Sequence, residues 1–266
     1  MTSVIPFDAR RFQSAAKHYL SGRPVYPAQL IADVALLCGL SRNDQVLDLG
    51  CGPGQLALAF ASLAQSVLAV DPEPEMLALC EAQITAAALT NVVIERGSSN
   101  DLDARMGSFK LVAIGRAFHW MDRVATLQRL ETMVVPAGAV VLFGSEHPKL
   151  PDNAWVKEFD AIVEAYAEAD PGRTIRKGPD WVGHEAVLLG SRFAQLQRVS
   201  VITRYQLTLD QLIDRALSRS STTAARLGDR GADMVGDIRR HFAARAGAGD
   251  LVEIVEAQAL IARRPT

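Results

Sequence analysis

A loop of alternating glycines is the part of this sequence whose residue types point most directly to a ligand. Asp48 is followed by Gly50, Gly52 and Gly54 in the stretch VLDLGCGPG. A dinucleotide-binding loop needs its third glycine three residues after the second, where this sequence has Gln55, and no Gly-Lys-Ser/Thr of a phosphate P-loop follows. A tight turn between strand and helix would account for one glycine. Three beside an acid predict a ligand that needs close backbone approach and carries no phosphate.

Polar residues also follow three later apolar runs. Asp71 ends the second run, where an acid can accept hydrogen bonds from both hydroxyls of a ribose. The segment RGSSNDLD follows the third run, and IGRAFHWMD, which contains His119, follows the fourth. Because ligands of open α/β sheets bind at the carboxyl ends of the strands, we expect these segments to meet the glycine loop there.

The elements that must position these residues alternate between strand and helix. Strand-length apolar runs cover residues 45–50, 66–71, 91–97, 109–115 and 137–145, with helical patterns between them. Continuous apolar strands alternating with helices predict a doubly wound α/β fold, a mostly parallel sheet with helices on both faces. Two short helices, at 11–20 and 27–38, are expected to precede it.

The alternation stops after residue 146. A helix is expected at 153–169 and an irregular loop at 170–183, followed by one or two strands at 193–207. Thr208 and Gln211 have the spacing of a capping box. A helix near 232–244 and a final strand at 251–264 complete the chain.

These elements predict three parts of the chain. Residues 1–146 form an N-terminal cover and the cofactor-binding core. Residues 147–190 form an insertion or cap rather than a separate domain, since the sheet resumes in residues 191–266.

Composition and charge limit the classes of partner. The 266 residues carry a formal net charge of −2, which gives no general attraction to nucleic acid or to a membrane surface. Residues 191–266 contain 12 Arg and no Lys against 8 Asp and Glu. That excess could favour an acidic small molecule, although solvated helix faces are the simpler interpretation.

Other sequence features concern location and metal binding. Cys38, Cys51 and Cys80 lack metal-type spacing, so we expect neither a metal site nor disulfides, as fits a reducing cytoplasm. No signal peptide or membrane-spanning run is evident.

In three segments, the sequence resembles the class I S-adenosylmethionine (SAM) dependent methyltransferases. The segments are VLDLGCGPG, the AFHW-x-D of residues 117–122, and AAKHYLSGRPVYP at the N-terminus. The resemblance is greatest to the small-molecule branch that includes the ubiquinone/menaquinone-type and trans-aconitate-type enzymes. It is firm over residues 15–145, weaker over 191–266 and absent over 147–190. It implies a Rossmann-like sheet of seven strands.

The resemblance also implies which residues contact SAM. The glycine loop would receive the methionine half, with Asp48 near its ammonium. Asp71 would bind the ribose, with Glu73 as the less favoured candidate. Asp101, with Asp103 as its rival, would meet the adenine amino group. The full set of expected cofactor contacts is Tyr19, Arg23, Asp48, Gly50, Cys51, Gly52, Gly54, Asp71, Pro72, Ser99, Asn100, Asp101 and Ala117. Of these, Tyr19 and Arg23 are candidates for the cofactor carboxylate, which Arg can pair through two hydrogen bonds.

His119 is the candidate catalytic residue, because it lies on the loop that would face the transferred methyl group. It would either orient the acceptor or remove its proton. Trp120, Trp155 and Trp181, together with His119, are the candidate substrate contacts. The segment departs from the family in one respect, since Arg116 precedes Ala117 where Asn or Ser is frequent.

We therefore expect a methyltransferase that acts on a small molecule, with its acceptor and its oligomeric state left open. The first alternative is a SAM-binding regulatory module without catalysis. A nicotinamide-dependent oxidoreductase is opposed by the glycine spacing. A nucleic-acid methyltransferase is opposed by the charge and by GRAFHW, which stands where such enzymes have an Asn-Pro-Pro-Tyr-type motif.

Overall fold

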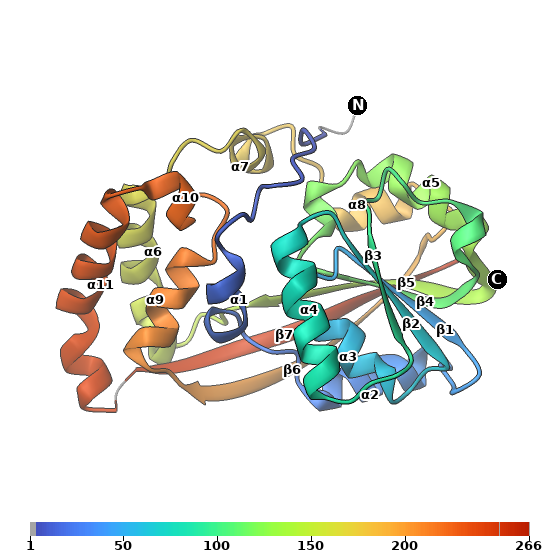
Figure 1. Cartoon of the computed structure of the whole chain (residues 1–266), viewed down its shortest axis with the longest axis horizontal. Helices are drawn as coiled ribbons and strands as arrows, with labels where there is room; N and C mark the ends of the chain where they lie inside the picture. Colours follow the sequence, from blue (N-terminus) through green and yellow to red (C-terminus); the bar gives the residue numbers. More distant parts are fainter. Residues whose placement is uncertain (1–3, 250, 266) are drawn as a thin grey trace.

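A seven-stranded sheet forms the centre of the computed structural model, which describes residues 4–249 and 251–265 (Figure 1). The strands are β1 (Gln45–Leu49), β2 (Ser66–Asp71), β3 (Val92–Arg96), β4 (Phe109–Gly115), β5 (Val134–Glu146), β6 (Gln195–Gln206) and β7 (Val252–Arg263). Their order in the sheet is β3-β2-β1-β4-β5-β7-β6. The first five are parallel, and β7 runs antiparallel to both β5 and β6. The predicted α/β class and mostly parallel sheet of seven strands are confirmed.

The strand order reverses between β1 and β4, which places the ligand site. From β1 the chain moves outward to β2 and β3, and then returns to β4 on the other side of β1. The loops that follow β1 and β4 therefore diverge and leave a crevice at the carboxyl ends of the strands. Asp48 pairs in register with Ala69 of β2 and Ala113 of β4, so it lies at the centre of this edge.

Helices cover both faces of the sheet. The first face packs against α2 (Ala28–Leu37), α3 (Gln55–Ala61) and α4 (Pro74–Ala86), which share one apolar core with β1, β2, β4 and β5. The second face packs against α5 (Arg123–Met133) and α8 (His184–Leu189). This burial on both sides explains the continuous apolar runs in β1, β2, β4 and β5.

A group of helices, here called the cap, lies at the far end of the β6–β7 hairpin (Figure 1). It consists of α6 (Ala154–Tyr166), α9 (Leu209–Leu217), α10 (Ala224–Leu227) and α11 (Arg230–Gly247). These helices enclose a core of their own, in which Trp155, Phe159 and Phe242 are buried. Helix α1 (Ala16–Gly22) lies between the cap and the sheet and contacts α9.

Residues 147–190 divide between these two parts of the molecule. Helix α6 joins the cap, whereas α8 packs on the sheet. The expected irregular loop over 170–183 is wrong in part, because it contains α7 (Pro171–Lys177). This helix forms because the Asp170 side chain accepts a hydrogen bond from the Gly172 N–H and Pro171 occupies the first turn. The expected strand or strands at 193–207 are the single strand β6.

A search of every described helix finds none with the length and apolar character needed to cross a membrane.

Candidate active site

The glycine loop between β1 and α3 has a backbone that only glycine adopts easily. Gly50, Gly52 and Gly54 all have positive φ, at 71°, 54° and 86°. A Cβ at Gly50 would lie 2.6 Å from the Ala117 Cβ, and one at Gly54 would lie 2.5 Å from the Cys80 Sγ. A Cβ at Gly52 would meet no atom within 4 Å, since Gly52 faces a cavity. Gly50 and Gly54 thus permit tight packing behind the loop, and Gly52 leaves its front bare.

Asp48 is a buried carboxylate with one unsatisfied oxygen. Its Oδ2 accepts a hydrogen bond of 2.8 Å from the Ala57 N–H, while its Oδ1 has no partner among the described residues. Burial, opposed by that hydrogen bond and reinforced by the nearby Asp71, raises the pKa of Asp48 to about 7. Asp48 lines a small cavity of about 260 Å³ that also exposes Arg116. A cation bound there would satisfy the free oxygen, so the site fits the ammonium of an amino acid.

Asp71 lies at the end of the neighbouring strand and faces a larger cavity. Its Oδ2 accepts from the Gly52 N–H and its Oδ1 from the Glu73 N–H, both at 2.9 Å. Each oxygen keeps a further lone pair for a hydroxyl donor. Burial raises the pKa of Asp71 to about 6, although the two N–H groups lower it. The position fits a ribose, as the sequence predicts.

The larger cavity, here called the cofactor cavity, measures about 800 Å³ and lies at the carboxyl ends of the strands. The segment Phe7–Phe12 forms part of its wall. The expected cofactor residues that line it are Tyr19, Gly50, Gly52, Asp71, Pro72, Ser99 and Ala117. Cys51 lines the small cavity, together with Asp48. Gly54 lines neither of these cavities, and it serves as the N-cap of α3.

The segment after β3 is only partly brought to the cofactor cavity. Ser98 and Ser99 line it, whereas Asn100 and Asp101 are exposed. Asp101 accepts hydrogen bonds from the N–H and the hydroxyl of Ser98, at 2.8 and 2.7 Å, and thereby shapes the loop. Asp103, its rival, pairs with Arg105 at the surface. The adenine role of Asp101 stays a prediction.

A second cavity of about 1020 Å³, here called the acceptor cavity, adjoins the first. Four residues line both: Phe12, Tyr19, Arg116 and Trp120. Tyr19 and Arg116 also line the small cavity beside Asp48. The three spaces therefore meet at Tyr19 and Arg116.

His119 lines the acceptor cavity from the short 3₁₀ helix Phe118–Trp120. Its ring lies 4.5 Å from that of Trp120 and 6.3 Å from that of His184, between centroids. Burial, followed by the positive charge of Arg176 and the neighbouring His184, lowers the pKa of His119 well below its ordinary value. The imidazole is therefore neutral at physiological pH and is a weak base.

Arg116 is the site residue that the sequence interpretation noticed without assigning it a role. It has a φ of 55° and donates hydrogen bonds to the Pro24 carbonyl (2.7 Å), the Ser145 hydroxyl (3.2 Å) and the Gln55 side chain (3.3 Å). Its guanidinium also lies 4.5 Å from the centre of the Tyr26 ring. The signal was the arginine itself, at a loop position where the family has Asn or Ser.

Arg23 does not reach the cofactor cavity. It donates two hydrogen bonds of 2.9 Å to Ser218 of the cap, and it lines the acceptor cavity. Its expected contact with the cofactor carboxylate has no geometric support among the described residues, and Arg116 is better placed.

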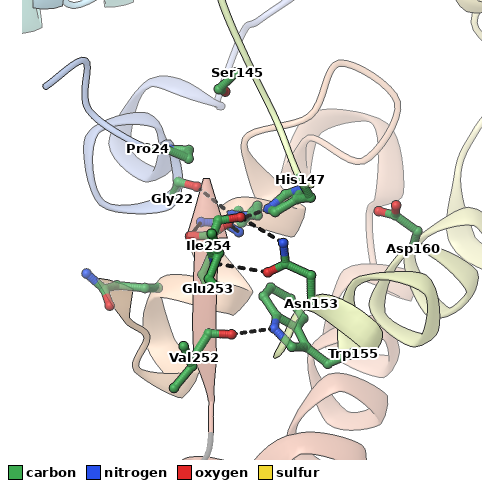
Figure 2. Close-up of polar contacts among 12 residues, drawn as sticks. Gly22, Pro24, Ser145, His147, Asn153, Trp155, Asp160, Val252, Glu253 and Ile254 are labelled. Carbon is green, nitrogen blue, oxygen red and sulfur yellow. Dashed lines mark hydrogen bonds and ion pairs between the residues drawn. The ribbon is translucent and has the colours of Figure 1, made fainter. Parts of the chain in front are cut away.

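Two of the expected substrate contacts lie away from these cavities. Trp155 belongs to the cap core, and its indole N–H donates to the Val252 carbonyl at 2.6 Å (Figure 2). Trp181 stacks with the guanidinium of Arg123, 3.8 Å from the ring centre. Neither lines the cofactor, small or acceptor cavity, whereas Trp120 lines two of them.

Sequence reasoning assigned no individual role to several residues of the acceptor-cavity lining. The unassigned residues include Ser145, His147, Arg173, Arg176, Arg215 and Arg219. The excess of arginine after residue 190 was the available signal for two of them, and it was interpreted as solvated helix surface.

Comparison with known proteins agrees with this geometry. A family model described as a methyltransferase domain matches residues 46–138. An uncharacterized methyltransferase of Mycobacterium tuberculosis is 31% identical over 210 residues, which cover 79% of this chain and 76% of the relative.

Solved structures share the fold at lower identity. A SAM-dependent methyltransferase from Geobacter sulfurreducens, in complex with S-adenosyl-L-homocysteine, has a TM-score of 0.55 at 13% identity and covers 98% of this chain and 99% of its own. One from Thiobacillus denitrificans, in complex with the same molecule, has a TM-score of 0.54 at 16% identity and covers 98% and 100%.

The chain belongs to the class I SAM-dependent methyltransferases. It is accordingly an enzyme, and SAM is its cofactor. The alternatives of a regulatory module and of a nicotinamide-dependent oxidoreductase are set aside by this membership.

Proposed function

We propose that the protein transfers the methyl group of SAM to a small molecule held in the acceptor cavity. The observation that carries the proposal is the junction of the cavities at Tyr19 and Arg116. A donor bound in the first cavity and an acceptor bound in the second would meet there. The acceptor cavity lies among the sheet, α7 and the cap, and a pocket walled by several elements supports a small-molecule acceptor.

The described contacts support a specific placement of the cofactor. We assign the ribose to Asp71, with Ser99 on the adenine side, and the ammonium to Asp48. The cofactor carboxylate is assigned to Arg116 and Tyr19, which line the same small cavity as Asp48. Asp101 remains the proposed partner of the adenine amino group.

The cap is the proposed acceptor-binding part of the chain. Its contributions to the acceptor cavity are Arg215 and Arg219, with Ser220 and Ser221 just beyond α9. Residues 1–146 supply the cofactor cavity. Residues 147–190, expected as an insertion or cap, supply α6 to the cap and α7 to the cavity wall.

Bound SAM supplies a methyl group on a positively charged sulfur that is already a good leaving group. The protein has to hold the nucleophile about 3–3.5 Å from that carbon, in line with the breaking bond and away from water. Phe12 and Trp120 can exclude water at the junction. His119, being neutral, can orient the acceptor through a hydrogen bond.

Calorimetric titration with S-adenosylhomocysteine tests the cofactor placement. We expect micromolar binding to the native protein and at least a tenfold loss, about 1.4 kcal/mol, in Asp71→Asn. Asp229→Asn, at an exposed residue outside the cavities, is the matched control and should bind normally. Equal binding by all three proteins would contradict the placement.

Acceptor screening tests the small-molecule assignment. SAM and pools of metabolites are incubated with the protein, and S-adenosylhomocysteine formation is followed. Turnover with a small molecule is expected. Methylation of RNA or protein substrates alone would refute the assignment.

A further inference from the structure

We propose that the acceptor is an organic anion, recognised through carboxylate or phosphate groups by arginines of the acceptor cavity. This inference rests on the proposed function, in which that cavity holds the acceptor. The cavity is lined by six arginines and two histidines, and no Asp or Glu is among its lining residues. The arginines are Arg23, Arg116, Arg173, Arg176, Arg215 and Arg219.

Three of these arginines are already paired with acids outside the cavity lining. Arg173 pairs with Glu164, Arg215 with Glu253, and Arg219 with Asp160 at 2.6 Å. Each acid fixes the position of its arginine side chain. The three arginines therefore form an ordered part of the cavity wall and can still donate hydrogen bonds into the cavity. Their charges are largely compensated.

Arg116 has no acid partner among the described residues, but the proposed placement gives it the cofactor carboxylate. Arg23 and Arg176 have no such compensation. Neither has a carboxylate within 4 Å in the part of the chain that the structure describes. Arg23 donates only to the neutral Ser218, and Arg176 lies with its guanidinium 5.4 Å from the Trp120 ring centre. Burial and the positive charges of neighbouring arginines, only partly offset by Tyr19, lower the pKa of Arg23 to about 10. Burial and Arg173 likewise lower the pKa of Arg176, partly offset by the charge of Asp170, which itself pairs with Arg11.

A partly buried cation without a counter-ion destabilises the unliganded protein, and a bound anion relieves that cost. Arginine also suits planar carboxylates and phosphates, which it can bind through two parallel hydrogen bonds. Arg176 comes from α7, and Arg23 directly follows α1. The anion would therefore lie between α7 and the end of α1.

The charge of the cofactor acts in the same direction. In the proposed placement Arg116 pairs with the cofactor carboxylate and Asp48 with its ammonium, which leaves the sulfonium charge uncompensated. The acceptor would then face positive charge both from the cavity wall and from the donor. A neutral or cationic acceptor would gain nothing from this field, whereas an anion would be both bound and oriented.

Calorimetry on the full chain with simple probes tests the inference. Glutarate, inorganic phosphate and the neutral analogue glutaramide are titrated into protein saturated with sinefungin, a stable SAM analogue in which a carbon that carries an amine replaces the methylated sulfur. We expect at least one of the two anions to bind and glutaramide not to bind. Binding of glutarate alone would identify a carboxylate site, and binding of phosphate alone a phosphate site.

Variants assign the binding to the cavity. Arg176→Gln and Arg23→Gln should each weaken anion binding at least tenfold, while Arg23→Lys, which keeps the charge, should recover part of it. Arg239→Gln is the matched control, since Arg239 pairs with Asp210 on the outer surface of the cap. S-adenosylhomocysteine binding, measured in every variant, reports whether the protein is folded and its cofactor site intact.

The outcomes separate two failures. Two results would overturn the anion proposal and leave the proposed function intact, provided that S-adenosylhomocysteine binds. One is equal affinity for glutaramide and glutarate, and the other is no binding of either anion at 20 mM. Unchanged anion binding in both glutamine variants would also overturn it. If the native protein does not bind S-adenosylhomocysteine, the cofactor placement fails, and the anion proposal fails with it.

Discussion

The guanidinium of Arg215 lies against the carboxylate of Glu253 and joins the cap helix α9 to strand β7 by two hydrogen bonds. Both side chains are buried. The same carboxylate lies 2.6 Å from the Nε2 of His147, a contact drawn in Figure 2. Arg215 also donates to the Gly22 carbonyl at the end of α1. The Arg215–Glu253 pair thus connects the cap, the sheet and the N-terminal cover.

Glu253→Gln should destabilise the protein by about 3 kcal/mol at neutral pH, because it leaves the buried Arg215 without its counter-ion. Denaturant unfolding measures the change. Glu256→Gln, in the same strand at a residue without an ion pair among those described, is the control and should cost little. Equal effects of the two substitutions would contradict the assigned importance of this pair.

Acid should remove the same stabilisation. Burial alone would raise the pKa of Glu253, but the contacts with His147 and Arg215 outweigh it and hold the pKa below its ordinary value of 4.5. A carboxyl whose pKa is lower in the folded state stabilises the fold at neutral pH and loses that effect as pH falls through the folded pKa. Native protein should therefore lose more stability than Glu253→Gln between pH 5 and acid pH. Parallel pH curves for the two would refute this.

Cofactor binding should release protons near pH 6. The pKa of Asp48, about 7, means that this carboxyl is mostly protonated at pH 6, and an ammonium bound beside it favours the ionised form. S-adenosylhomocysteine affinity should consequently rise with pH up to about 7 and then level off. Calorimetry in buffers of different ionisation enthalpy counts the protons. The Asp48→Asn variant should bind S-adenosylhomocysteine more weakly and lose most of the proton release. If the proton release is unchanged in this variant, the protons come from another group.

Alanine substitutions should separate two roles of the glycine loop. Both Gly52→Ala and Gly54→Ala force a side chain into a left-handed conformation at a cost of about 1–2 kcal/mol. Gly54→Ala should lower stability further, because its Cβ meets Cys80, whereas Gly52→Ala should chiefly weaken S-adenosylhomocysteine binding. Unfolding and titration of both variants check this. If Gly52→Ala bound the ligand normally, the bare surface would have no role in binding.

Loss of a general base reduces turnover roughly 100-fold or more. We expect His119→Gln to have a smaller effect than this, because His119 orients the acceptor and does not remove its proton. Because the pKa of His119 is well below its ordinary value, native turnover at saturating SAM should show no step near pH 6.5 from this residue. A native step at that pH that disappears in His119→Gln would instead identify the imidazole as the base.

The fold, and the position of the glycine loop and Asp71 at the carboxyl ends of the strands, could be predicted because their signals are local. The continuous apolar runs marked every parallel strand, and the spacing of Thr208 and Gln211 predicted a capping box that the structure confirms. The conformation of the glycine loop is likewise set by its own residues. Asp71 could be placed because it ends a buried strand, and ligands of such sheets bind at the carboxyl ends of the strands.

The acceptor half depends on pairings between distant residues. Whether an arginine is compensated depends on an acid far along the chain, such as Asp160 for Arg219, and no periodic pattern records that. The expected position of Trp155 near the substrate was wrong because it too depends on contacts between distant parts of the chain. Its indole is equally suited to a pocket or to a core, and only the packing of α6 against α11 decides between them.

The β6–β7 hairpin has an evolutionary consequence. Its strands pair without a break from Gln195 with Arg263 to Gln206 with Val252, and α9, α10 and α11 are all inserted at its far end. These helices have their own apolar core and lie outside the cofactor-binding segment 46–138. Because α6 completes that core, α6 and the helices between β6 and β7 can diverge together while the segment that carries the glycine loop is retained, so new acceptors can arise from changes confined to the cap.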